Sequence, residues 1–222
     1  MSFSRHSRYL IFLVPALVFF CTLPGFSQNT TVVWSDPVLV SDSSQNAASP
    51  RIELNAAGEP LVLWGSGGST APAIRLARWQ NGNFLPAQTL GTGNIASDLY
   101  GFDELDLATR GDTVFVAFEN VEQGIYLLRA TDGGLSFSGP TTVFTPAGGR
   151  IVTLPAVVAD AAGNPLVSYL YELSSWSNAQ FHLARSTDGG LSFETPVIAS
   201  APADGDFVCE CCASDIVTRG DS

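Results

Sequence analysis

Lysine is absent from this chain of 222 residues, so its ten basic side chains are all arginines. The chain also has 21 acidic side chains, so its net charge is −11. Such an acidic surface repels phosphate backbones and disfavours nucleic acid as a partner. Charged residues make up only 14% of the chain, whereas glycine and proline number 21 and 13. This composition is typical of a turn-rich β protein rather than a helical one.

Sustained helical periodicity is also missing from the sequence. After residue 28, no window keeps apolar residues at a 3.6-residue spacing. Short alternating runs bounded by Gly, Pro, Asn and Asp recur instead, which is the pattern of half-buried strands. We therefore predict an all-β fold.

The one long apolar run lies at the N-terminus, over residues 9–20, and follows the basic residues Arg5 and Arg8. Small residues before Gln28 complete the pattern of a secretory signal peptide over residues 1–27. The run is shorter than the roughly 20 residues of a membrane-spanning helix. Lipidation at Cys21 is the alternative, but the bulky residues before it are a poor context. The prediction is a secreted, periplasmic or cell-surface protein with no membrane span after cleavage.

An eight-residue turn motif occurs twice, at Ala130–Phe137 and at Ser186–Phe193. Its Asp can accept backbone N–H groups from the residues that follow, and its Gly pair supplies positive φ. The closing Phe then begins the next strand. The motif therefore predicts a hairpin turn at each copy.

The rest of the chain is organised as repeats. Hairpins with turn glycines at Gly58, Gly111, Gly163 and Gly220 recur at intervals of 52 to 57 residues. Each complete hairpin is followed by a second one, and four strands per repeat is the pattern of a β-propeller blade. The predicted parts of residues 28–222 are a closing strand at 31–40, blades at 48–90, 103–145 and 152–200, and the start of another blade at 213–222. About three and a half blades of a propeller are thus expected.

The turn motif resembles the Asp-box, or bacterial neuraminidase repeat, of the sialidase-like β-propellers, with Ser in place of Thr and Phe in place of Trp. The residues that carry the resemblance are Asp132, Gly134, Phe137, Ser186, Asp188, Gly190 and Phe193. The resemblance implies a six-bladed ring. It also implies that these turns lie on the face opposite the sialidase active site, so that Asp132 and Asp188 close turns rather than catalyse a reaction.

The same resemblance identifies candidate catalytic residues. Sialidases bind the substrate carboxylate with three arginines and use an Asp as acid/base and a Tyr–Glu pair as nucleophile. Arg51 begins a run that matches two of three residues around the first of these arginines, although an ordinary strand start explains it equally well. Asp98 and Asp103 match another acidic position near the substrate, or are solvated residues. The loop at 65–73, where the family carries its second arginine and its acid/base Asp, contains neither.

Other candidates lie on the link face, which carries the links between blades (41–50, 91–102, 146–152 and 200–213) and the loops between second and third strands. Function is concentrated in loops on a rigid scaffold. Tyr100, Arg150 and Trp176 are the ligand-facing candidates there, with packing between blades as the alternative for the aromatic residues. His182, in a predicted strand, gives little support to a His-based catalytic triad.

Cys209, Cys211 and Cys212 remain once a leader that contains Cys21 is removed. An exported protein favours oxidation, and we expect a bridge between Cys209 and either Cys211 or Cys212. A zinc site lacks an evident fourth ligand, and calcium at the nearby acidic residues 204, 206 and 210 rests on charge alone. The prediction is therefore a structural disulfide without a metal or other cofactor.

The expected function is recognition of glycans or proteins outside the cytoplasm. Sialylated or other glycans, or an extracellular protein, are the expected partners. An exo-α-sialidase that releases terminal sialic acid is the first alternative, and a structural or sorting module of a larger surface protein is the second. The sequence leaves open whether the protein is an enzyme.

Stability provides the first test. Three and a half blades expose faces that normally pack on neighbouring blades, so the chain alone is expected to be poorly stable or to aggregate. Thermal unfolding of the purified chain, followed by circular dichroism and light scattering, measures this. A sharp and reversible transition from a monomer would contradict the expectation.

Overall fold

The computed structural model describes residues 35–42, 46–66, 72–92, 105–120, 124–173, 175, 177–200, 208 and 212–219. The predicted signal peptide and several candidate residues lie outside these ranges, namely Asp98, Tyr100, Asp103, Trp176, Cys209 and Cys211. The chain divides into the units Met1–Pro37 and Val38–Ser222, and every described strand belongs to the second unit. Within the described ranges, no helix has the length and apolar character needed to cross a membrane.

The first sheet begins with β1 (Ala47–Leu54), β2 (Pro60–Ser66) and β3 (Ala73–Gln80), which pair antiparallel in chain order. Its outer edge differs from the single fourth strand that the four-stranded repeat predicts for the blade at 48–90. Both β4 (Asn83–Phe84) and β5 (Gln88–Thr92) pair with β3, at opposite ends of that strand. The residues between them, including Pro86, form no strand, and proline lacks the N–H that a ladder needs.

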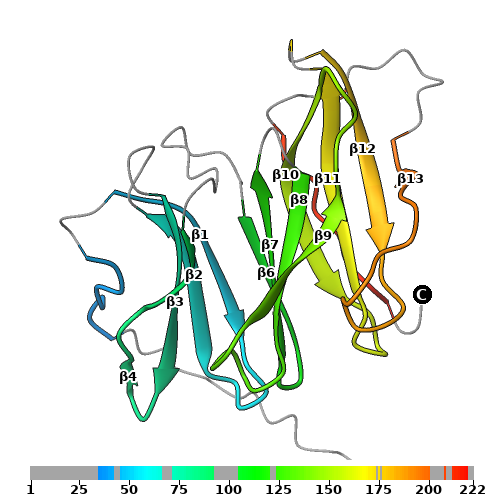
Figure 1. The fold of residues 1–222 in the computed structure, drawn as a ribbon. Helices are drawn as coiled ribbons and strands as arrows, with labels where there is room; N and C mark the ends of the chain where they lie inside the picture. The colour runs from blue at the N-terminus through cyan, green and yellow to red at the C-terminus, as the bar shows by residue number, and fades with distance from the viewer. Residues whose placement is uncertain are drawn as a thin grey trace, which may run out of the picture. The chain divides into compact units, whose positions relative to one another are not determined.

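The two further sheets are each a four-stranded antiparallel meander in chain order (Figure 1). The second contains β6 (Leu105–Arg110), β7 (Thr113–Asn120), β8 (Gly124–Ala130) and β9 (Ser138–Phe144). The third contains β10 (Arg150–Ala159), β11 (Pro165–Leu173), β12 (Ser177–Arg185) and β13 (Val197–Ile198). The all-β prediction is confirmed for the described residues, and a closed six-bladed ring stays a prediction.

The turn glycines explain how each meander begins. Gly58, Gly111 and Gly163 lie between the first two strands of the three sheets and have φ values of 75°, 58° and 83°. Glycine adopts such positive φ without the steric cost that a Cβ imposes. The periodic glycines of the sequence therefore mark real chain reversals.

Two segments that were predicted to contain strands form no strand where the structure describes them, residues 35–40 and 212–219. The second of these is held to the third sheet by side chains. The Thr218 hydroxyl donates to the Ala159 carbonyl at 3.0 Å, and the Ser214 and Ser168 hydroxyl oxygens lie 2.5 Å apart. Side-chain bonds of this kind attach the segment to the sheet but do not form a backbone ladder.

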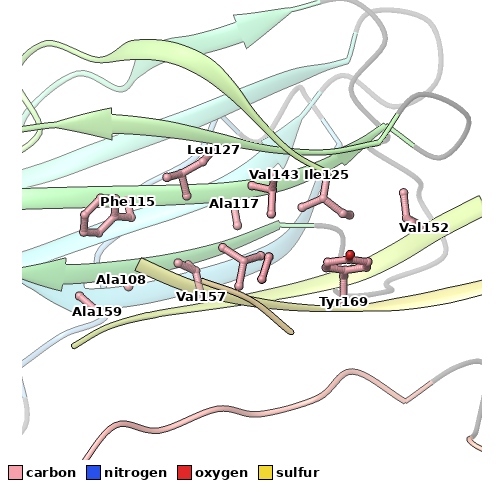
Figure 2. Packing of buried hydrophobic residues seen from close by; sticks show 12 residues of the cluster. Ala108, Phe115, Ala117, Ile125, Leu127, Val143, Val152, Val157, Ala159 and Tyr169 are labelled. Atoms are coloured by element: carbon pink, nitrogen blue, oxygen red, sulfur yellow. The ribbon is translucent and has the colours of Figure 1, made fainter. Parts of the chain in front are cut away.

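The hydrophobic core consists of two clusters, one on each face of the second sheet. Strand β7 contributes to both, because successive side chains of a strand point to opposite faces. Val114 and Val116 pack with Leu63 and Ile74 of the first sheet. Phe115 and Ala117 belong to the cluster that includes residues of the third sheet, which Figure 2 shows. Burial on both faces explains why β7 reads as a nearly continuous apolar run.

Each copy of the turn motif also packs against the preceding sheet. The Gln88 side-chain amide of the first sheet donates to the Gly134 carbonyl at 2.7 Å. In the second copy, a Cβ added at Gly190 would lie 2.9 Å from Cδ2 of Leu127, which is fully buried in the second sheet. Glycine is therefore required at Gly190 both by φ and by the closeness of the neighbouring sheet.

A matched pair of substitutions tests this close packing. Gly134 and Gly190 have φ values of 82° and 90°, but a Cβ at Gly134 would have its nearest contact at 3.5 Å. Gly134→Ala should cost about 1–2 kcal/mol, the penalty of left-handed backbone for an L-residue. Gly190→Ala should lower the free energy of unfolding by roughly 1–3 kcal/mol more, because it adds overpacking. Urea unfolding measures both, and equal costs would show that the contact with Leu127 carries no energy.

Candidate functional site

Arg51, the arginine predicted from the sialidase resemblance, connects two sheets. It lies in β1 directly after a bulge at Ser49, whose φ is 51°. Its Nε donates to Oδ1 of Asp106 in β6 at 3.0 Å, and its Nη1 donates to the Pro50 carbonyl at 3.2 Å. The structure thus gives this guanidinium a role in joining the first and second sheets.

Asp106 extends the same connection to the third sheet. Its Oδ2 accepts the backbone N–H of Val157 in β10 at 2.7 Å. Burial raises the pKa of Asp106 from its ordinary value, although the Val157 N–H and the Arg51 guanidinium act in the opposite direction. One carboxylate therefore contacts the first strands of both neighbouring sheets.

Two further buried carboxylates bind the same irregular stretch of β10. The strand is bulged between Thr153 and Ala156, and Leu154 within the bulge has a φ of 55°. Glu119 Oε2 accepts the Leu154 N–H at 2.6 Å, and the Thr153 hydroxyl donates to Oε1 of Glu172 at 3.4 Å. A bulge removes backbone groups from the ladder, and buried backbone groups need partners. Glu119 therefore binds the backbone of the bulge, and Glu172 binds the Thr153 side chain beside it.

The turn aspartates Asp132 and Asp188 bind their own turns. Oδ1 of Asp188 accepts the backbone N–H groups of Leu191 and Ser192 at 3.0 and 2.9 Å. Asp132 accepts the equivalent N–H groups of Leu135 and Ser136 at 2.9 and 3.1 Å, and it also accepts the Ser136 hydroxyl. The Ser192 hydroxyl likewise donates to Oδ2 of Asp188 at 2.5 Å. These hydrogen bonds lower the pKa values of both carboxyl groups, and the bonds from the Ser192 and Ser136 hydroxyls have the largest effect.

The two copies of the motif differ at their first residue. The buried hydroxyl of Ser186 donates to Oδ1 of Asp188 at 2.8 Å and accepts the Gly190 N–H at 2.8 Å. Ala130 occupies this position in the other copy and has no hydroxyl. The closing residues Phe137 and Phe193 pack against the first and second hydrophobic clusters. The turn at Asp188 is therefore the more extensively hydrogen-bonded of the two.

Arg150, the ligand-facing candidate that the structure describes, packs on an aromatic group. Its Cζ lies 4.7 Å from the centroid of the Tyr171 ring, a cation–π distance. Tyr171 in turn contacts Phe144 and His182, with ring centroids 5.3 and 4.9 Å away. Burial, and secondly the charge of Arg150, lower the pKa of His182. These half-buried side chains bring together β9 of the second sheet and β10–β12 of the third.

The cysteine cluster is described only at Cys212, which is exposed. The bridge predicted from Cys209 lies outside the described residues and stays a prediction. Among the residues that the structure describes, no group of three or more His, Cys, Asp or Glu side chains gathers as metal ligands would.

A cavity of about 340 Å³ opens beside the first sheet. Its lining residues are Val40, Ser41, Asp42, Ala47, Trp64, Arg75 and Ala87. Trp64 and Arg75 are cross-strand partners in β2 and β3, so their side chains share one face of the sheet. Because neighbouring Leu63 points into the core cluster between the first and second sheets, this is the opposite face.

The guanidinium of Arg75 is held in place from both sides. Its Nε donates to the Ser66 hydroxyl at 3.2 Å, and its Nη1 donates to the Thr89 hydroxyl. Trp64 is 6% exposed, so its indole is largely fixed by packing. The cavity therefore combines an oriented cation and an aromatic wall with the carboxylate of Asp42 and the hydroxyl of Ser41.

Sequence reasoning missed this cavity, although it searched the link at 41–50, which supplies three of the lining residues. The available signal was a tryptophan at the end of one apolar run and an arginine at the start of the next. That signal indicates a shared site only once the strand register is known, because the register places Trp64 beside Arg75.

No family model and no curated protein matches this chain. Among solved structures, it is similar to a protein of unknown function from Dyadobacter fermentans, with 17% identity, a TM-score of 0.53, and coverage of 71% of this chain and 56% of that one. An α-L-arabinofuranosidase of Fusarium graminearum, solved with arabinobiose, gives 14% identity, a TM-score of 0.48, and coverage of 76% and 52%. An endo-arabinanase from Bacillus licheniformis gives 16%, 0.45, and coverage of 71% and 61%.

The chain thus spans between about half and three fifths of the length of these solved structures. At such identities, the likeness to the Dyadobacter protein shows a shared fold alone. The chemistry of this chain has to be argued from its own residues.

The lowered pKa values of the turn aspartates predict acid sensitivity. A carboxyl group whose pKa is lower in the folded state stabilises the fold at pH values above its pKa in the unfolded state, 3.8. This stabilisation is lost as the pH falls through the lowered pKa of the folded state. Asp188→Asn should therefore destabilise the protein at pH 7 and flatten the decline in stability below pH ~4. Asp132→Asn should act in the same direction but less strongly, since its turn lacks the Ser186 hydroxyl.

Urea unfolding at several pH values between neutral and about 2.5 measures the effect. A pH dependence that is unchanged in Asp188→Asn would show that this turn does not couple protonation to stability.

Proposed function

We propose that the chain is an exported glycan-recognising module of the sialidase-like, Asp-box β-propeller type, and that it binds a saccharide in the cavity beside Trp64. The single observation that carries this proposal is the cavity itself, because its size and lining suit a sugar. Export is inferred from the signal-peptide pattern of residues 1–27, and the propeller type from the repeated turn motif and the three antiparallel sheets, which have five, four and four strands.

The volume of the cavity supports a small ligand. At about 340 Å³ it lies at the lower end of the range of roughly 300–1,000 Å³ typical of small-molecule sites. A saccharide presents an apolar C–H face and a rim of hydroxyl groups. The small accessible part of the Trp64 indole, which is 6% exposed, offers an apolar contact for the first, and the polar groups of Arg75, Asp42 and Ser41 offer hydrogen bonds to the second.

The position of the cavity is also favourable. Residues 41, 42 and 47 belong to the link that precedes or begins the first sheet, whereas Trp64 and Arg75 lie on paired strands. Loops that close over a rigid sheet are the usual location of binding residues. The strands fix the aromatic wall and the cation, and the link supplies the remaining polar groups.

Recognition is better supported than sialoside hydrolysis. Arg51, the described arginine that the sialidase resemblance assigns to the substrate carboxylate, already donates to Asp106 and Pro50. The half-buried Asp106 and the buried acids Glu119 and Glu172 accept hydrogen bonds from β10. None of these contacts supports a free acid/base pair, so we favour a binding module.

A glycan array tests the proposal. We expect the purified chain to retain at least one immobilised saccharide and not to hydrolyse a fluorogenic sialoside. Trp64→Ala should weaken binding at least about tenfold, since aromatic anchors of a pocket typically contribute more than 1 kcal/mol. Trp79→Ala is the matched control, because Trp79 packs edge-on against Phe84 and does not line the cavity.

Circular dichroism and urea unfolding of both variants separate loss of the site from loss of the fold. Absence of binding to every saccharide, or equal weakening by both tryptophan variants when both are folded, would contradict a glycan site in this cavity. Turnover of the sialoside would instead establish the hydrolase.

A further inference from the structure

We infer that the cavity beside Trp64 accepts a neutral saccharide and discriminates against acidic sugars such as sialic acids and uronic acids. This inference rests on the proposed glycan-binding function and specifies the ligand class. It is carried by the charge of the lining and by the way in which Arg75 is already hydrogen-bonded.

The lining of the cavity is electrically balanced. Among the lining residues that the structure describes, Arg75 is a cation and Asp42 is an anion, and the others are uncharged. An acidic sugar would introduce a second carboxylate into a space that holds a single guanidinium. Two like charges at close range cost free energy unless additional cations or donors compensate them. A neutral sugar leaves the Arg75–Asp42 balance unchanged.

The guanidinium of Arg75 is poorly disposed to bind a carboxylate in the bidentate geometry. Carboxylate recognition by arginine typically uses two parallel N–H groups on one edge of the guanidinium. The side edge, which pairs Nε with Nη2, is already engaged because Nε donates to Ser66 at 3.2 Å. On the end edge, Nη1 donates to Thr89. What remains is suited to single hydrogen bonds, which sugar hydroxyl oxygens accept.

Asp42 also favours a ligand with hydroxyl groups. A carboxylate accepts hydrogen bonds through two oxygens and several lone pairs, so it can bind O–H donors in addition to contacts within the protein. Neutral sugars offer such donors, whereas the carboxylate of an acidic sugar is repelled by Asp42. The net charge of −11 adds a long-range repulsion of the same sign.

A paired glycan array tests the inference on the full chain. The probes are neutral oligosaccharides, lactose among them, each printed beside a sialylated or uronic-acid-containing counterpart. We expect binding to a neutral probe, and at least about tenfold weaker binding to its acidic counterpart, as expected for an uncompensated carboxylate near Asp42. The dissociation constants are then measured in solution by calorimetry at two salt concentrations.

Charge variants separate a local effect from the global charge. Asp42→Asn should reduce the discrimination between neutral and acidic probes at least about threefold, because it removes the anion in the lining. Asp215→Asn is the control, since it removes the same charge from the segment at 212–219, which does not line the cavity. Circular dichroism confirms that each variant is folded.

The outcomes are distinguishable. Preferential binding of acidic probes would overturn the inference and leave glycan recognition intact. Equal discrimination by Asp42→Asn and the parent chain would overturn the role of the lining charges. Binding of no probe would overturn the proposed function itself, and the inference with it.

Discussion

The carboxylate of Asp106 is the contact on which the arrangement of the three sheets depends. Asp106 belongs to β6, and its carboxylate accepts hydrogen bonds from the Arg51 guanidinium of β1 and from the Val157 N–H of β10. The two hydrophobic clusters stabilise the packing of the sheets, but the hydrophobic effect is not directional. The hydrogen bonds that this half-buried carboxylate accepts from both neighbouring sheets add the direction that apolar packing lacks. Burial raises the pKa of this group, so its charged form is retained at some cost.

Bulges in the first strands of the first and third sheets make this arrangement possible. Ser49 and Leu154 adopt positive φ, and each is followed by a proline. A bulge turns backbone and side chains away from the regular ladder. At the bulge of β10 the Leu154 N–H is bound by Glu119 and the Thr153 hydroxyl by Glu172, and beyond the bulge the Val157 N–H is bound by Asp106, which explains why acids lie within otherwise apolar strands. Glu119, Glu172 and Asp106 have the side chains that catalytic acids have, but their hydrogen bonds hold β10 in place.

The candidate cavity is built differently from the sheet junctions. Its lining combines a cross-strand pair, Trp64 and Arg75, with residues that precede or begin β1, Asp42 among them. None of the lining side chains contributes to the two hydrophobic clusters. Hydrogen bonds from the polar groups of this site to a ligand would therefore not disturb the two clusters. The acids around β10 could bind a ligand only by giving up hydrogen bonds that hold β10.

Most of the strands, the turns and the repeat could be predicted from the sequence, although the strands expected within 31–40 and 213–222 are not formed in the residues that the structure describes. Alternation of apolar residues, turn glycines and the Asp-Gly-Gly motif act locally, through φ preferences and hydrogen bonds between residues close in the chain. The divided outer edge of the first sheet, the role of Arg51 and the cavity beside Trp64 were decided by the tertiary structure. Each depends on register, on a bulge or on contact between residues far apart in the chain, such as Arg51 and Asp106, and no local pattern encodes which distant partner a side chain meets.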